Sequence, residues 1–316
     1  MGAFEVKTLG ISAFKQSKKF IEEKARPIER SIFENLFYNG SRADRVKAIL
    51  AYQNEDGGFG NGIEPDFRLK KSSPMATSIG LRYLRELEDR TDARQSIQRA
   101  IKYLESSYDR SRKGWYSVPK SVNLEPHAPW WNYEDNLKMT IIDQNWGNPS
   151  AEIIAYLYRY RGYLKILNIN DLVENGIFRL ESKFKFESEH EIYCYLKLYK
   201  EVEEENKLRI EYKLKQAIKQ VLVTDEKHWH EYVPKPLDFV KAPDHNKFGI
   251  EKEIIESQLD FLVDEIEKNG FIKPPWGESF YSGDLSLAYD EWIGKLTLRA
   301  LRRLSRYGRL TEECIY

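Results

Sequence analysis

The stretch that indicates the fold most clearly covers residues 47–60 and reads KAILAYQNEDGGFG. Its first half carries apolar residues such as Ile49 and Leu50 at the three-to-four residue spacing of an amphipathic helix. Its second half places glycines before an aromatic residue. Glycine supplies the positive φ that ends a helix, and the aromatic side chain can then fold back onto neighbouring helices. We therefore predict a helix followed by a tight turn, with a positive φ at Gly57 or Gly58.

Degenerate copies of this unit follow at residues 99–115, 217–229 and 258–271. Each combines an amphipathic helix with a turn that carries an aromatic residue, and some units, such as the first with Gln53, have a glutamine near the helix end. Such a glutamine can satisfy terminal carbonyls or the start of a neighbouring helix. The repeat predicts helix pairs stacked side by side, and closing the row into a ring would remove its exposed ends.

The segment 53–60 resembles the repeat of protein prenyltransferase subunits and the QW repeat of squalene and oxidosqualene cyclases. The copy at 99–115 fits the same pattern, except that Tyr108 stands where glutamine is expected. The chain is thus similar to the terpenoid cyclase and protein prenyltransferase superfamily over residues 45–278. The resemblance implies an all-α fold, namely an (α/α)6 toroid in which paired inner and outer helices surround a cavity. It implies a single domain over residues 1–316 with long irregular loops.

Helical periodicity dominates the remaining chain, and no convincing strand ladder is found. Helix starts are marked by Ser41 as an N-cap and by the pairs Ser73-Pro74 and Asn148-Pro149. The expected helical segments are 11–26, 28–38, 42–53, 73–88, 92–107, 148–165, 171–183, 188–203, 206–223, 250–267 and 285–304.

The chain lacks the motifs that carry the superfamily's reactions. The cyclases protonate an alkene with an Asp-x-Asp-Asp motif, and the prenyltransferases hold zinc with an Asp, a nearby Cys and a distant His. Neither pattern occurs, and Cys194 and Cys314 stand in no such setting. The resemblance therefore leaves the reaction open, and we predict no cofactor and no metal. A metal site remains an alternative, because imidazole is a common metal ligand and the chain contains His228, His230 and His245.

The first candidate site is the loop Glu64-Pro65-Asp66-Phe67-Arg68, which follows the strong repeat turn. Two carboxylates held close together move each other's pKa values apart, and one can then act as acid and the other as base. Arg68 is near enough to pair with either carboxylate. The alternative is a salt-bridged loop that caps the next helix.

The second candidate is residues 125–133, in which two prolines hold His127, Trp130 and Trp131 on an extended segment. Indole rings stack on sugar faces, apolar chains or cations. The alternative is a loop that plugs the mouth of the ring. Because both loops follow repeat turns, we expect them to meet at one rim of the toroid.

We predict that two further residues, both from the C-terminal third of the chain, bind the substrate together with the residues of these loops. Trp276 lies in a loop rich in Gly and Pro, where aromatic side chains can line a cavity, and Glu291 lies near the start of the last helix. The predicted catalytic residues are Glu64, Asp66 and His127. The predicted substrate-binding residues are Arg68, Trp130, Trp131, Trp276 and Glu291.

Composition narrows the function classes. The 316 residues include 50 Lys and Arg and 50 Asp and Glu, and such a balance argues against nucleic acid as a partner. No run approaches the ~18 apolar residues of a transmembrane helix, and the first twenty residues lack a secretory pattern. We therefore expect a cytoplasmic protein without a transmembrane segment, whose partner is a small molecule.

Three functions remain open. The first is binding of an apolar or isoprenoid-like ligand in a central, aromatic-lined cavity. The second is a carbohydrate-active (α/α)6 hydrolase or lyase, for which an inverting enzyme needs two carboxyl groups about 6.5–9.5 Å apart. Glu64 and Asp66 are too close in sequence to serve as that pair, so Glu291 would be needed. The third is a non-catalytic binding protein.

Overall fold

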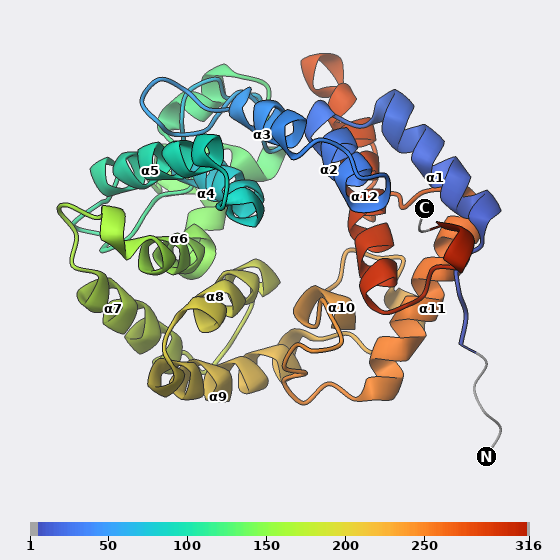
Figure 1. Cartoon of the computed structure of the whole chain (residues 1–316). Coiled ribbons are helices and arrows are strands. Elements are labelled where there is room, and N and C mark those ends of the chain that lie inside the picture. Colours follow the sequence, from blue (N-terminus) through green and yellow to red (C-terminus); the bar gives the residue numbers. More distant parts are fainter. Residues whose placement is uncertain (1–5, 315–316) are drawn as a thin grey trace. The chain divides into compact units, whose positions relative to one another are not determined.

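The computed structural model describes residues 6–314, which are mainly α-helical, as expected for an all-α protein (Figure 1). The chain divides into two compact units, and each is described by itself. Unit 1 contains the residues up to 48, residues 222–282 and those from 286 onward, and unit 2 contains residues 49–221 and 283–285. The single-domain toroid remains a prediction.

Unit 2 is built from three helix pairs. Its α-helices are α4 (Pro74–Leu84), α5 (Thr91–Ser106), α6 (Gly147–Arg159), α7 (Ile169–Glu181), α8 (Glu189–Glu201) and α9 (Glu204–Val221), and α3 (Arg42–Leu50) spans the boundary with unit 1. Helix α6 packs between α4 and α8, while α5, α7 and α9 pack on α4, α6 and α8 in turn (Figure 1). The row α4–α6–α8 is the more deeply buried layer, because nearly every residue of α4 and α6 is inaccessible.

Unit 2 also contains short elements, most of which lie between its α-helices. These are the 3-10 helices η1 (Arg85–Leu87), η2 (Lys120–Leu124), η3 (Pro129–Trp131), η4 (Ile141–Gln144), η5 (Arg161–Tyr163) and η7 (Gly283–Leu285), and the strands β1 (Tyr133–Glu134) and β2 (Met139–Thr140). The two strands pair antiparallel, with Tyr133 opposite Thr140. Two-residue strands are too short for an alternating pattern, which is why the sequence shows no ladder there.

Unit 1 is assembled from both ends of the chain. Its helices are α1 (Ile11–Lys24), α2 (Pro27–Phe37), α10 (Pro236–Phe239), α11 (Lys252–Asn269) and α12 (Leu287–Arg306), with η6 (Glu226–His228) and η8 (Glu312–Cys314). Helix α1 packs against α2, α11 and α12. Leu9 donates its main-chain N–H to the Arg309 carbonyl over 2.8 Å, and Thr311 donates to the Leu9 carbonyl over 3.1 Å. Backbone pairing thus joins segments 300 residues apart.

Each expected helical segment corresponds to a helix, with ends that shift by a few residues. The largest differences are at the C-terminal ends of α4 and α6, where the continuation is 3-10 rather than α-helical. Helix α10 was not expected, because four residues are too few to show periodicity. No helix within residues 6–314 has both the length and the apolar character needed to cross a membrane.

Two of the expected helix caps are confirmed, and the third is different. Ser41 accepts the Asp44 N–H over 3.2 Å, and Ser73 accepts the Ala76 N–H over 3.1 Å. Asn148 also has non-helical backbone angles at the start of α6. Its side-chain oxygen, however, lies 3.7 Å from the Cys194 sulfur on α8 and does not cap the helix. Tertiary packing thus redirects this amide.

The repeat turn forms as expected. Gly57 has a φ of +89°, which confirms the predicted positive φ. The Gln53 side chain donates to the Gly57 carbonyl over 2.8 Å and to the Ser96 carbonyl over 3.1 Å, and it accepts from the Ser96 hydroxyl over 2.8 Å. One glutamine therefore closes its own turn and also fastens that turn to α5.

In the weaker copies, tryptophan or glutamine side chains also bind main-chain groups, but the bonds differ from those of Gln53. The buried Trp115 indole donates to the Leu104 carbonyl near the end of α5 over 2.8 Å, so this ring folds back on the preceding helix. Trp229 donates to the Val223 carbonyl over 2.9 Å. In the last copy, Gln258 accepts the Leu237 N–H at the start of α10 over 2.6 Å. These bonds satisfy the main-chain groups that helix ends leave unpaired.

We expect Gly57→Ala to destabilise the protein. A Cβ atom there would lie 2.5 Å from the Arg99 carbonyl oxygen, and the backbone has a left-handed φ. The free energy of unfolding should fall by about 1–3 kcal/mol from backbone strain alone, with a further loss from the contact. Chemical denaturation would measure this change.

Two glycines are matched controls for this prediction. Gly162 has neither a positive φ nor an atom within 4 Å of an added Cβ, and Gly249 has a φ of +86° with open space around it. Gly162→Ala should leave stability nearly unchanged, and Gly249→Ala should show the strain without the contact. Equal stability of Gly57→Ala and Gly162→Ala would contradict the structural role of the turn.

Candidate functional site

The two proline-containing loops lie side by side in unit 2. Phe67 and His127 form an antiparallel bridge. On either side of it, Arg68 donates its N–H to the Pro126 carbonyl over 2.8 Å, and Ala128 donates to the Asp66 carbonyl over 2.7 Å. Backbone hydrogen bonds, rather than a chance side-chain contact, therefore hold the two candidate loops together.

A buried carboxylate and a tryptophan meet at this junction. The Asp66 side chain is only 6% exposed, and its Oδ2 accepts the indole N–H of Trp130 over 3.0 Å. Trp130 itself is partly exposed. Glu64 is also buried, whereas Arg68 is half-buried. Pairing of Arg68 with either carboxylate stays a prediction.

His127 is held in one tautomer. Its Nδ1 lies 2.7 Å from the Glu125 carbonyl oxygen. A carbonyl oxygen only accepts hydrogen bonds, so Nδ1 must carry the proton in this contact. The contact thus fixes the orientation of the imidazole ring relative to its own loop.

Trp131 is the anchor of the second loop. Its ring is 5% exposed and packs edge-on against Phe67, with the ring centres 4.8 Å apart. The indole N–H is buried and has no hydrogen-bond partner among the described residues. Through η3, this loop also contacts η4, the segment that leads into α6. The ring therefore helps to fix the loop, and its substrate-binding role stays a prediction.

The other two predicted site residues belong to unit 1. Trp276 donates its indole N–H to the Tyr281 hydroxyl over 2.6 Å, and its ring packs edge-on against Trp292. Glu291 is a half-buried residue of α12. Six of the eight predicted site residues thus lie together in unit 2, and the roles of all eight remain predictions.

Two of the histidines considered as metal ligands, His228 and His230, lie beside different carboxylates. His228 lies 2.9 Å from a Glu231 carboxylate oxygen, which raises the pKa of its imidazole. The nearest carboxylate oxygen to His230 belongs to Glu265, at 3.9 Å. Within residues 6–314, no group of three His, Cys, Asp or Glu side chains is arranged to hold a metal ion.

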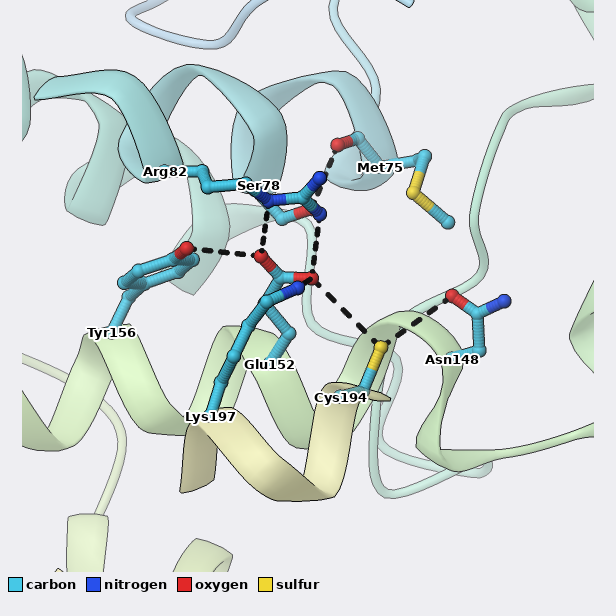
Figure 2. Close-up of polar contacts among 8 residues, drawn as sticks. All are labelled: Met75, Ser78, Arg82, Asn148, Glu152, Tyr156, Cys194 and Lys197. Carbon is cyan, nitrogen blue, oxygen red and sulfur yellow. Dashed lines mark hydrogen bonds and ion pairs between the residues drawn. The ribbon is translucent and has the colours of Figure 1, made fainter. Parts of the chain in front are cut away.

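A second cluster, which the sequence did not reveal, lies between α4, α6 and α8 (Figure 2). The Glu152 side chain on α6 is 1% exposed. Arg82 of α4 donates hydrogen bonds to both carboxylate oxygens of Glu152, with Nε 3.1 Å from Oε1 and Nη2 2.9 Å from Oε2. The Lys197 ammonium of α8 binds Oε2 from the other side. Tyr156 donates its hydroxyl to Oε1 over 2.9 Å.

The charges of this cluster shift one another's pKa values. Burial alone would raise the pKa of Glu152, but the neighbouring Arg82 and Lys197 outweigh burial and lower it to about 2. The pKa of Lys197 is lowered by burial and by Arg82, although Glu152 opposes this shift. At neutral pH the carboxylate is therefore ionised, and the ammonium is less well stabilised than an exposed one.

The thiol of Cys194 completes the cluster. Its sulfur lies 3.7 Å from the Asn148 amide oxygen and 3.8 Å from Glu152 Oε2 (Figure 2). Burial raises the pKa of this thiol to about 12. A thiol that stays protonated is a poor nucleophile, so Cys194 acts here as a weak donor between two oxygen acceptors.

The sequence does contain a signal for this cluster, which is a single charge within each of three apolar helical runs. Arg82, Glu152 and Lys197 are each the lone charged residue within an apolar helical run: MATSIGLRYL, PSAEIIAYLY and IYCYLKLY. A charge at the centre of such a run cannot face solvent and apolar neighbours at once, so it needs a partner on another helix. Which helices supply the partners depends on tertiary packing.

We expect Glu152→Gln to destabilise the protein in a pH-dependent way. Removing one member of a buried ion pair costs about 3–5 kcal/mol, and the lower value applies because Arg82 keeps 40% of its side-chain surface accessible. The ionised carboxylate stabilises the fold fully above its unfolded pKa of 4.5, and this contribution disappears as the pH falls through about 2. Urea denaturation at pH 7 and near pH 3 would measure it.

The control is Glu204→Gln, which alters an exposed carboxylate of α9. The stability gap between wild type and Glu152→Gln should shrink toward pH 3, whereas Glu204→Gln should stay close to wild type throughout. A gap for Glu152→Gln that does not change with pH would rule out the ionised carboxylate as its source.

No family model, no curated protein and no solved structure matches the chain. The similarity to toroid enzymes therefore rests on the sequence motifs alone.

Proposed function

We propose that the chain binds a small organic anion through Arg82 and Lys197 in unit 2. The observation that carries this proposal is the charge count of the cluster. Two cations share the single carboxylate of Glu152, and among the described residues neither forms an ion pair with another acid. The cluster therefore carries one positive charge more than it has carboxylates, and an anion beside the largely buried Lys197 would balance that charge.

The pKa of Lys197 supports the same conclusion. It is lowered, so the nearby negative charge does not offset burial and the repulsion from Arg82. A bound anion would supply the missing charge and raise that pKa again. The cluster is thus better satisfied with an anion than without one.

Access to the two cations also supports binding. Arg82 keeps 40% of its side-chain surface accessible and Lys197 keeps 16%, while Glu152 between them keeps 1%. The carboxylate is buried, whereas both cations are partly accessible to solvent. A ligand would therefore meet positive charge first.

The ligand class follows from combining this cluster with the sequence resemblance. An isoprenoid diphosphate joins an anionic head to an apolar tail, and its head suits Arg82 and Lys197. In the proposed (α/α)6 toroid, the tail would lie in a central cavity lined by aromatic residues. The expected cytoplasmic location fits such a ligand but rests on composition alone.

The same chemistry favours binding over covalent catalysis at this cluster. Glu152 stays ionised and is bound by Arg82, Lys197 and Tyr156, so it is a poor general acid. Cys194 keeps its proton. We therefore propose a binding role here and no reaction.

A carbohydrate-active enzyme is the second candidate, and a specific observation favours it. The buried Asp66 carboxylate accepts a hydrogen bond from the partly exposed Trp130, and the backbone places His127 next to them. A carboxylate beside an indole suits sugar binding. Release of reducing sugar from a polysaccharide panel by wild type, and its loss in Asp66→Asn, would favour this candidate.

The test of the anion proposal is calorimetric titration with three probes: farnesyl diphosphate, inorganic pyrophosphate and farnesol. We expect farnesyl diphosphate to bind most tightly and pyrophosphate more weakly. Lys197→Met should weaken both by about tenfold or more, because a hydrogen bond to a charged group contributes about 1.5–3 kcal/mol.

Lys185→Met is the matched control, since Lys185 is an exposed lysine of the same unit that forms an ion pair with Glu187. Melting temperatures would show that both variants remain folded. Absence of diphosphate binding, or equal loss in Lys197→Met and Lys185→Met, would overturn the proposal. Binding of farnesol alone would assign the protein to purely apolar ligands.

A further inference from the structure

Unit 2 carries a second cationic feature, which is distinct from the Glu152 cluster. A shallow surface recess of about 520 Å³ lies beside the start of α6 and is lined by two arginines. Arg112 comes from the turn that follows α5, and Arg179 comes from α7. Within residues 6–314, neither guanidinium forms an ion pair with a carboxylate; their hydrogen bonds go to main-chain carbonyls.

The first guanidinium is fixed on three sides. Arg112 donates Nε–H to the Trp115 carbonyl over 3.1 Å, and its Nη2 donates to the Asp143 carbonyl. The group also stacks on the Tyr116 ring, 4.6 Å from the ring centre. These contacts hold its orientation but contribute no formal negative charge.

The second guanidinium is fixed in the same way. Arg179 donates Nη2–H to the Arg112 carbonyl over 3.1 Å and stacks 4.6 Å from the centre of the Trp146 ring. Its Nε–H is buried and has no acceptor in the described part of the chain. The stacking on Trp146 and the carbonyl contact pre-order this side chain, so little entropy remains to be lost on binding.

Each arginine therefore keeps its Nη1 group without a protein acceptor in residues 6–314. Guanidinium stays charged at every accessible pH, and carbonyl dipoles do not neutralise it. Two oriented positive charges thus line one recess. Two guanidinium groups match the several oxygens of a phosphate better than the single charge of a lysine would.

The one carboxylate in the lining is already occupied. Asp143 accepts from the Ser117 N–H over 2.6 Å and from the Ser117 hydroxyl over 3.0 Å. It also accepts from the Thr140 N–H over 3.2 Å and from the Thr140 hydroxyl over 2.8 Å. Burial raises the pKa of Asp143 despite these bonds. Its oxygens hydrogen-bond to the loop and not to the two guanidinium groups, although the charge of Arg112 opposes the burial that raises the pKa of Asp143.

We propose that this recess binds the phosphate group of a small phosphorylated molecule through Arg112 and Arg179. Gln144 and Ser111 also line it and are placed to contact the remainder of such a ligand. The site stands independently of the anion proposed at Arg82 and Lys197. It needs no toroid and no isoprenoid.

The experiment follows the Nε–H signals of arginine by ¹H–¹⁵N NMR of the full chain. Chloride is replaced by inorganic phosphate at constant ionic strength, so that screening does not change. We expect the Arg112 and Arg179 signals to shift and saturate. Arg179→Gln should weaken the apparent phosphate affinity about tenfold or more, as expected for loss of a charge-assisted hydrogen bond.

Three variants make the result decisive. Arg179→Lys keeps the charge but loses the planar fork, so it should bind more weakly than wild type and more tightly than Arg179→Gln. Arg209→Gln is the matched control, because Arg209 is already paired with Glu174 and Glu181. Lys197→Met should leave phosphate binding at the recess unchanged.

Equal responses to phosphate and chloride would overturn the proposal, as would a loss of affinity in Arg209→Gln as large as in Arg179→Gln. Melting temperatures would show whether Arg179→Gln is folded. If it is not, the comparison between Arg179→Lys and wild type decides, and equal affinities would again contradict the site.

Discussion

The buried carboxylate of Glu152 is the constraint on which unit 2 depends. An ionised carboxylate cannot lie in an apolar interior without cations and donors around it. Helix α4 supplies Arg82 and α8 supplies Lys197, so the helices on both sides of α6 must present these side chains at the same level. The apolar faces of the three helices could pack in several ways, whereas the fork of Arg82 on two carboxylate oxygens accepts few.

Charge balance also links structure to ligand binding in this unit. The Glu152 cluster has one cation more than it has carboxylates, and the recess at Arg112 and Arg179 has two guanidinium groups held only by carbonyls and rings. Elsewhere in the same unit, Arg209 is paired fully with two carboxylates. The two sites at which we propose anion binding thus share one property, which is positive charge in excess of the carboxylates bound to it.

Local features were predictable from the sequence because they depend on neighbouring residues. The left-handed Gly57 and the caps at Ser41 and Ser73 follow from rules that act within four residues. The sequence also predicted that the Asp66 and His127 loops meet, and the bridge between Phe67 and His127 shows that they do, while their place on the rim of a toroid stays a prediction. The sequence did not reveal the Glu152 cluster, whose partners are 70 and 45 residues away and depend on which helices become neighbours. The contact of the Asn148 side chain with Cys194, in place of a helix cap, likewise depends on which helix packs beside α6.

The backbone pairing of Leu9 with Arg309 has a consequence for synthesis on the ribosome. Domains generally fold as the chain emerges, earlier parts first. Unit 2 is almost continuous, so its helix pairs can assemble as soon as residues 49–221 have left the exit tunnel. Helix α1 precedes unit 2 in the chain, whereas its partners α11 and α12 follow residues 49–221. The apolar surface of α1 that these two helices cover therefore stays open while residues 49–221 are made, although α2 can pack on α1 early.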